Sequence, residues 1–203
     1  MESPVRPVTA LIVGAGNRGN RYASYAFHHP DRLRIVGVAD PSELRREMAR
    51  ETFDLLPSQC YESAEDVAAR PQLADVVING TMDLQHVPTS LPLLAAGYDI
   101  LLEKPFATSE HEADLLVKSA RRHGRKIMVC HVLRYAPFYR AVRERVDRGE
   151  IGDIINVQTN EHVSYHHMAV AFIRGKWRTQ AESGSSMLMA KCCHDLDLIM
   201  WMK

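Results

Sequence analysis

The sequence lacks long apolar runs, since no stretch approaches the roughly twenty apolar residues that a membrane-spanning helix needs. Residues 1–7 also lack the apolar centre of a secretory leader and are predicted to be a short disordered lead-in. No excess of positive charge is present, because 25 basic and 25 acidic residues give a formal net charge of zero. We therefore expect neither a nucleic acid nor a membrane as a partner, and we predict a cytoplasmic location.

Cysteine is scarce, at four residues in a chain of 203. Cys192 and Cys193 are adjacent in a predicted helix, which is a poor geometry for a disulfide between them, so free thiols in a reducing compartment are expected. A zinc site made of these two thiols and His194 is not expected. Neighbouring helical positions point about 100° apart and cannot converge on one ion. No metal is predicted.

The most informative stretch is residues 11–19, where a short apolar run ends in a GxGxxG turn that opens a helix. Gly14 allows a tight turn, Gly16 allows close approach of a pyrophosphate, and Gly19 lets the helix pack on its strand. Backbone amides in the first helical turn, around Asn17 and Arg18, suit phosphate oxygens. Taken alone, the pattern also fits a simple tight turn, so its context must decide.

Asp40 supplies part of that context, because it ends a second apolar run, residues 33–39, about twenty residues after the glycines. A carboxylate there can accept hydrogen bonds from the adenine ribose, or it can cap the helix that starts near residue 43. It would repel a 2′-phosphate, which favours NAD over NADP. Arg45 and Arg46 weaken this preference, since a nearby arginine can accommodate the phosphate.

Strand and helix patterns alternate through the first two thirds of the chain. This alternation predicts an α/β domain with a Rossmann-type, doubly wound parallel sheet. Further strands are expected at 60–61, 74–80, 98–102 and 126–130, and helices at 18–28, 43–52, 63–68, 87–96, 109–123 and 137–148. A capping box is expected between Ser109 and Glu112.

The pattern changes near residues 149–152, where we place a domain boundary between 1–150 and 151–203. Residues 153–163 alternate apolar with polar side chains and predict a strand with one solvated face. A loop over 164–186 and a helix from 187 to the end should follow. This is the expected start of an α+β domain with an open, mostly antiparallel sheet. Because 53 residues with one strand are marginal as a core, the chain is expected to be cut short. Either a partner supplies the missing sheet or the chain is a fragment of a longer protein.

Two clusters could carry chemistry. Glu103 and Lys104 follow a strand at the carboxyl edge of the parallel sheet, where ligands bind in such folds, and a lysine there can polarise a substrate oxygen. Lys191, His194 and Asp197 share one helical stripe, and a neutral imidazole can take a proton from a substrate hydroxyl. A surface Glu–Lys pair and an ordinary polar helix face are the alternatives.

The order of these motifs resembles the glucose-fructose oxidoreductase and inositol 2-dehydrogenase family, Gfo/Idh/MocA. The resemblance rests on the glycine loop, Thr81 with His86, Gly97, the Glu103-Lys104-Pro105 tripeptide, Arg134-Tyr135 and the helix from His194 to Asp197. It implies a nicotinamide-dependent oxidoreductase acting on a sugar, polyol or related hydroxyl compound. Members continue through an open sheet that completes the pocket and usually a dimer interface, which implies a homo-oligomer if that sheet is completed.

The resemblance also assigns roles to residues. It implies that Lys104 and His194 form the catalytic pair and that Thr81, His86 and Glu103 line the cofactor site. Arg134 is a candidate substrate residue. The family's usual aspartate, four residues before the histidine, is Ala190 here, with Lys191 beside it. This departure puts the common polyol mechanism in doubt and suggests another substrate.

Residues 161–178 combine flat apolar faces with many donors, which suits a ring that bears hydroxyls. Tyr165 and Trp177 are therefore further substrate candidates, as is Lys191 of the helix that follows, and the arginines of this stretch favour an acidic sugar. A positively charged surface loop is the alternative.

Two other functions of the protein stay open. One is a non-catalytic dinucleotide-binding or regulatory protein, and the other is a glycosidase that oxidises its substrate transiently with bound NAD.

Overall fold

The computed structural model describes residues 6–203, so most of the predicted lead-in lies outside the described residues. The chain forms two compact units, one that ends at Val129 and a second over Cys130–Lys203. The boundary expected near residues 149–152 lies inside the second unit. No helix within residues 6–203 is long and apolar enough to span a membrane.

A six-stranded sheet forms the centre of the first unit, and every neighbouring pair of strands is parallel. The strand order, β3-β2-β1-β4-β5-β6, reverses direction between β1 and β4 and confirms the doubly wound prediction. The strands are β1 (Val8–Val13), β2 (Leu33–Ala39), β3 (Cys60–Tyr61), β4 (Val76–Asn79), β5 (Asp99–Leu102) and β6 (Ile127–Val129).

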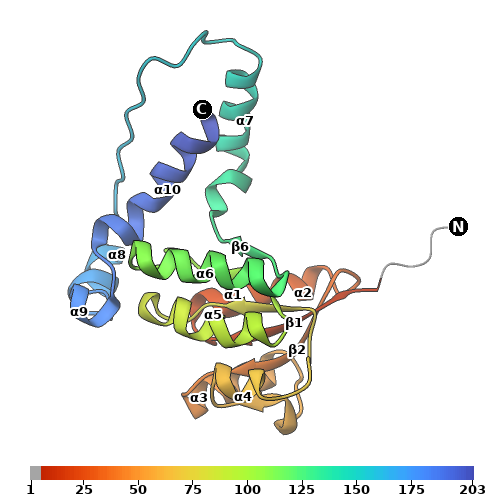
Figure 1. Cartoon of the computed structure of the whole chain (residues 1–203). Coiled ribbons are helices and arrows are strands. Elements are labelled where there is room, and N and C mark those ends of the chain that lie inside the picture. Colours follow the sequence, from red (N-terminus) through yellow and green to blue (C-terminus); the bar gives the residue numbers. More distant parts are fainter. Residues whose placement is uncertain (1–5) are drawn as a thin grey trace, which may run out of the picture. The chain divides into compact units, whose positions relative to one another are not determined.

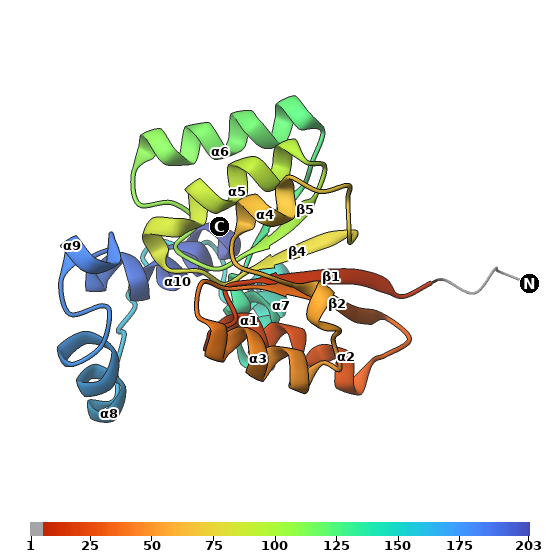
Figure 2. The same ribbon diagram turned by 90° about the horizontal axis from the view of Figure 1, so that it is seen from below.

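Helices cover both faces of this sheet, as Figure 2 shows. The helix expected over residues 18–28 is interrupted at Ser24 and forms two shorter helices. One face carries α1 (Asn17–Ala23), α2 (Tyr25–His28) and α3 (Glu43–Thr52), and the other carries α4 (Ala64–Ala68), α5 (His86–Ala95) and α6 (Glu110–His123). Short 3-10 turns, η1 (Pro57–Gln59) and η2 (Asp83–Gln85), precede β3 and α5.

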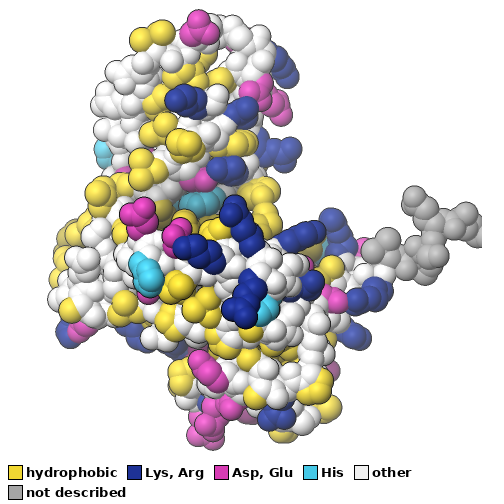
Figure 3. Space-filling view, viewed as in Figure 1, with side chains coloured by type: hydrophobic (Ala, Val, Ile, Leu, Met, Phe, Trp, Pro, Cys, Tyr) yellow, Lys and Arg dark blue, Asp and Glu magenta, His cyan; other side chains and the backbone are white. Residues whose placement is uncertain are grey.

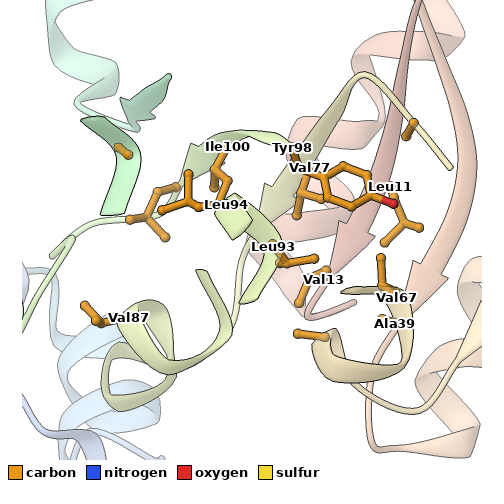
Figure 4. Packing of buried hydrophobic residues seen from close by; sticks show 14 of the residues in the cluster. Leu11, Val13, Ala39, Val67, Val77, Val87, Leu93, Leu94, Tyr98 and Ile100 are labelled. Carbon is orange, nitrogen blue, oxygen red and sulfur yellow. The ribbon is translucent and has the colours of Figure 1, made fainter. Parts of the chain in front are cut away.

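The core has two parts, one on each side of the sheet. On the side of α4 and α5, Tyr98, Leu93 and Leu94 pack against Leu11 and Val77 of the central strands (Figure 4). All five side chains are fully buried. Burying a large apolar side chain stabilises a fold by about 1.5 to 3 kcal/mol, so this packing fixes the strands whose carboxyl ends carry the predicted site.

The capping box expected at α6 forms only in part. The Ser109 hydroxyl accepts a hydrogen bond from the Glu112 amide, as predicted, but the Glu112 carboxylate accepts from the amide and hydroxyl of Thr108. Two donors on Thr108 outcompete the Ser109 amide. Acidic side chains lie at the start of this helix and basic ones at its end, which complements the helix dipole and is visible in Figure 3.

The second unit is helical. Figure 1 shows the chain leave α7, run through an extended connection and return to α10 through three short helical segments. Its elements are η3 (Val132–Tyr135), α7 (Pro137–Asp147), α8 (Tyr165–His167), η4 (Met168–Ile173), α9 (Gln180–Ser183) and α10 (Met187–Met202). The final helix is confirmed, whereas the stretch expected to be a loop, 164–186, contains α8, η4 and α9.

The strand expected over residues 153–163 is not formed. Alternation of apolar and polar side chains favours a strand only where a neighbouring strand supplies hydrogen bonds, and none of the residues from 6 to 203 pairs with this segment. Ile155 is consequently 91% exposed. The described part of the second unit therefore contains no strand.

Asp75 joins the start of β1 to the turn before β4. Its carboxylate accepts hydrogen bonds from the amide and hydroxyl of Thr9 and from the Arg6 guanidinium. The Arg6 contact, followed by the Thr9 amide, holds the pKa of Asp75 far below its usual value. A depressed pKa stabilises the fold above the unfolded-state pKa of about 4, and that stabilisation is lost as the pH falls.

The substitution Asp75→Asn is expected to lower the free energy of unfolding at pH 7 by about 1 kcal/mol. The value is modest because Arg6 is exposed and solvent screens its ion pair. Urea denaturation at pH 7 and pH 3 measures the effect. The variant should lose less stability between these two pH values than the unchanged protein does, and an equal loss would contradict the role given to Asp75.

Candidate dinucleotide site and the second-unit histidine cluster

The glycine loop lies at the carboxyl end of β1, and two of its glycines are required by the fold itself. Gly14 has φ +85°, and a Cβ there would lie 2.7 Å from the Thr81 amide nitrogen. A Cβ on Gly19 would overlap the Gly14 carbonyl oxygen. Gly80, which the sequence marked only as a strand end, is equally confined, because its Cβ would lie 2.7 Å from the Gly19 nitrogen. The turns after β1 and β4 are thus in direct contact.

Gly16 is different, because a Cβ there would have no protein atom within 4 Å. The protein therefore does not need glycine at this position for its own packing. Gly16 also caps α1 without a side-chain acceptor, and the first helical turn contains no acidic residue. Asn17 and Arg18 of this turn are exposed. These features fit the close approach of a pyrophosphate to the backbone of a helix start.

Asp40 is buried, at 4% exposure, and lies beside the glycine loop. One carboxylate oxygen accepts a hydrogen bond from the Ala15 amide and the other accepts from the Ser42 amide, both at 2.9 Å. The second contact is made with the residue that caps α3. Each oxygen retains capacity for a further donor, so this arrangement fits a ribose diol as well. Arg45 lies 3.9 Å from the same carboxylate, beside the position a 2′-phosphate would take.

Thr81 follows β4 and is held by a buried residue that sequence reasoning missed. Asn79 accepts a hydrogen bond from the Thr81 hydroxyl at 2.8 Å, and its amide group donates to Ser90 at 3.0 Å. A polar residue that ends an apolar strand was the available signal. Asn79 thereby links the turn that carries Thr81 to α5.

Glu103 and Lys104 lie at the carboxyl end of β5, on the same edge as the glycine loop. Glu103 is 5% exposed, and its two oxygens accept hydrogen bonds from the Tyr22 hydroxyl and the Lys104 amide, each at 2.6 Å. Arg18 lies 3.7 Å from this carboxylate. Glu103 is therefore not the exposed half of a surface Glu–Lys pair, because it is buried and bonded to α1.

His86 is 1% exposed at the start of α5. Its Nδ1 lies 2.7 Å from the Pro105 carbonyl oxygen, and its Nε2 lies 3.2 Å from the Thr81 carbonyl oxygen. The ring thus connects the turn after β4 with the turn after β5. Its predicted role at the cofactor site is consistent with contact through these turns.

In the second unit, polar side chains of α10 and of the segment around η3 form a cluster that includes His194. The Arg134 guanidinium donates two hydrogen bonds to Asp197, at 2.7 and 2.6 Å, and contacts the Trp201 ring. This ion pair raises the pKa of Arg134. His131, which sequence reasoning missed, has its Nε2 3.8 Å from Asp197 and its ring edge-on to that of His194.

The stripe of Lys191, His194 and Asp197 therefore has two kinds of neighbour. Asp197 binds Arg134, whereas the Lys191 amine lies 2.7 Å from His167 Nε2 and 5.6 Å from the centre of the Phe172 ring. Ala190, the position of the family's usual aspartate, is buried. Of the other substrate candidates, Tyr165 is 88% exposed and Trp177 is half-buried.

No disulfide is formed within the described residues, and none of their His, Cys, Asp and Glu side chains form a group of three placed to hold a metal ion. The site of the first unit offers backbone amides, the Asp40 and Glu103 carboxylates and the Lys104 side chain. In the first unit, these groups line one edge of a parallel sheet at the point where the strand order reverses. Such an edge is where dinucleotides bind in this class of fold.

Comparison with known proteins agrees with this class of fold. Residues 8–131 match the model of an oxidoreductase family with an NAD-binding Rossmann fold, and residues 139–203 match the GFO/IDH/MocA C-terminal domain. The chain belongs to the Gfo/Idh/MocA oxidoreductase family, as the resemblance of its motifs predicted. The family match confirms the predicted family and the prediction of an NAD-binding Rossmann fold for the first unit.

Among curated relatives, trans-1,2-dihydrobenzene-1,2-diol dehydrogenase of Mus musculus is 32% identical over 70% of the chain and 42% of its own length. Inositol 2-dehydrogenase of Corynebacterium glutamicum is 25% identical over 94% of the chain and 52% of its own length. The chain thus spans about half the length of these relatives. The solved scyllo-inositol dehydrogenase of Lactobacillus casei, with bound NAD(H) and scyllo-inositol, has a TM-score of 0.85 at 22% identity, covering 98% of this chain and 55% of that one.

Proposed function

We propose that this protein transfers hydride between NAD and a hydroxyl-bearing carbon of a sugar, polyol or related compound. The observation that carries the proposal is the sheet edge of the first unit, where the open space at Gly16, the Asp40 carboxylate and the Lys104 turn occur together. When bound, the nicotinamide accepts or returns the hydride. Inositol dehydrogenases among the relatives support a polyol as substrate.

In this proposal, Lys104 and His194 have different roles at the substrate hydroxyl group. The Lys104 ammonium donates a hydrogen bond to the substrate oxygen and stabilises developing negative charge. The His194 imidazole takes the hydroxyl proton as hydride leaves the same carbon, and returns it in the reverse direction. Arg134, Tyr165, Trp177 and Lys191 are proposed to contact the substrate.

Lys191 and the basic residues of the stretch before α9 favour a substrate that carries a carboxylate, such as an acidic sugar. Lysine and arginine recognise carboxylates by charge-assisted hydrogen bonds. The buried Ala190 removes the family's usual aspartate from the neighbourhood of His194. This combination supports a substrate different from that of the common polyol dehydrogenases.

Titration with NADH, followed by its fluorescence, tests the cofactor part of the proposal. Saturable binding of NADH is expected, with NADPH binding more weakly because its 2′-phosphate meets the Asp40 carboxylate. The substitution Asp40→Ser should strengthen NADPH binding about tenfold by removing this repulsion. Folded protein that binds neither nucleotide would contradict the proposal.

A screen of neutral polyols and acidic sugars for NADH formation tests the catalytic part. Turnover is expected, with acidic sugars preferred.

The buried Ala190 also supports a second candidate function, a dinucleotide-binding protein without catalysis. Tight NADH binding with no turnover on any compound of the screen would favour that candidate.

A further inference from the structure

The turn formed by Glu103, Lys104 and Pro105 is held at both ends by side chains from two other elements. On one side, the Tyr22 hydroxyl of α1 donates to Glu103 Oε1, and Glu103 Oε2 accepts from the Lys104 amide. On the other side, His86 of α5 contacts the Pro105 carbonyl. Lys104 thus lies between two anchored residues.

These contacts have clear donors and acceptors. The Tyr22 hydroxyl is the donor and the Glu103 Oε1 atom is the acceptor of their hydrogen bond. A carbonyl oxygen only accepts, so the short contact to Pro105 indicates that His86 Nδ1 carries a proton. Since Glu103 and His86 are almost fully buried, water cannot replace either contact at low cost.

We propose that Tyr22 and His86 are positioning residues, which fix the Lys104 turn relative to the glycine loop so that it meets the nicotinamide half of the dinucleotide. The proposal rests on the proposed function. Tyr22 lies on α1, the helix that starts at the glycine loop. His86 also contacts the Thr81 carbonyl, so it links the turns after β4 and β5.

The placement of the strands separates the two halves of the cofactor. Asp40 follows β2 and is placed for the adenine ribose, on one side of the strand-order reversal. The Lys104 turn follows β5, on the other side of that reversal. Displacement of this turn should therefore weaken binding of the nicotinamide half and leave binding of the adenine half unchanged.

The substitution Tyr22→Phe tests the proposal, because it removes one hydroxyl and keeps the ring. Without its Tyr22 contact, Glu103 should hold the Lys104 amide less firmly, and hydrogen exchange at that amide, followed by NMR, should become about tenfold faster. This measurement needs no cofactor. It therefore decides the structural part of the proposal even if the proposed function fails.

Binding of NADH and of ADP-ribose, which lacks the nicotinamide, gives the second readout. The Kd of NADH should rise about fivefold to tenfold in Tyr22→Phe, whereas the Kd of ADP-ribose should stay within about twofold. Tyr25→Phe is the matched control, since Tyr25 lies on the neighbouring helix α2 and is exposed. It should change neither the exchange rate nor the two affinities.

A pair of substitutions at His86 tests the other anchor. In His86→Asn, the side-chain amide can donate from near the position of Nδ1, and in His86→Gln from near the position of Nε2. The asparagine variant should therefore retain more NADH affinity.

An unchanged Lys104 exchange rate in Tyr22→Phe, or an equal loss of NADH and ADP-ribose affinity, would overturn the proposal. Absence of binding by the unchanged protein would instead overturn the proposed function.

Discussion

Gly19→Ala is expected to lower the free energy of unfolding by about 2 to 3 kcal/mol. The added Cβ would overlap the Gly14 carbonyl oxygen and lie 3.1 Å from Ile12 Cγ2. Neither neighbour can move freely, because the first is backbone and the second belongs to a fully buried side chain of the central strand. The better helix propensity of alanine, worth about 1 kcal/mol, offsets only part of this cost. The urea midpoint measures the effect.

Gly16→Ala is the matched control in the same loop. Its Cβ would point into open space, so the free energy of unfolding should change by less than about 0.5 kcal/mol. Affinity for NADH should nevertheless fall about tenfold or more, because the methyl group occupies the approach of the pyrophosphate. Equal losses of stability in the two variants would show that Gly16 is packed as closely as Gly19, which would contradict the open space found at Gly16.

Lys104→Met is expected to reduce kcat by about 10² to 10⁴ on any substrate that the unchanged protein turns over. Methionine keeps the length and apolar stem of the side chain but cannot polarise the substrate oxygen. His194→Asn should cause a loss of similar size, since it removes the group proposed to take the hydroxyl proton. Steady-state rates measure both effects, and the affinity of Lys104→Met for ADP-ribose should stay unchanged.

Lys118→Met is the control for the loss of a lysine, because Lys118 is exposed on α6 and forms an ion pair with the neighbouring Asp114. It should retain the full rate. If Lys104→Met also retained the full rate, the catalytic role proposed for Lys104 would be wrong. Retention of the rate by His194→Asn alone would assign the proton transfer to another group.

The first unit could be predicted from sequence because its signals are local. Apolar runs marked the strands, Ser63 and Gly124 marked helix ends, and the glycine pattern marked the turn after β1. Each of these signals acts within a few residues of the place where it occurs. The structure confirms them with shifts of one or two residues at the ends of elements.

The second unit was harder because its expected strand depends on partners elsewhere. Residues 153–163 have the alternation of a strand, but alternation does not supply the hydrogen bonds that a strand needs. The helices within 164–186 are too short to show a helical repeat of apolar residues, so the sequence pattern did not predict them. In both segments, the local sequence pattern could indicate which side chains are apolar, but it could not indicate whether the backbone is helical or extended.

The contacts of the candidate site could be predicted only in part. The types of side chain at Asp40 and Lys104 indicated their chemistry, and their position after strands indicated the edge on which they lie. The bond from Tyr22 to Glu103 joins residues 81 positions apart, and no spacing rule predicts it. The approach of His131 to His194 likewise depends on how η3 packs against α10.

The contact between Gly19 and Gly80 has a consequence for protein engineering. The Gly19 backbone occupies the room that a side chain on Gly80 would need, and the Gly80 backbone occupies the room that a side chain on Gly14 would need, so the two segments constrain each other's sequence. A chimaera that takes one segment from a relative with a bulkier residue at the position of Gly14 or Gly80 would contain a clash unless the other segment came from the same relative. Exchange of cofactor preference between relatives should therefore transplant both segments together.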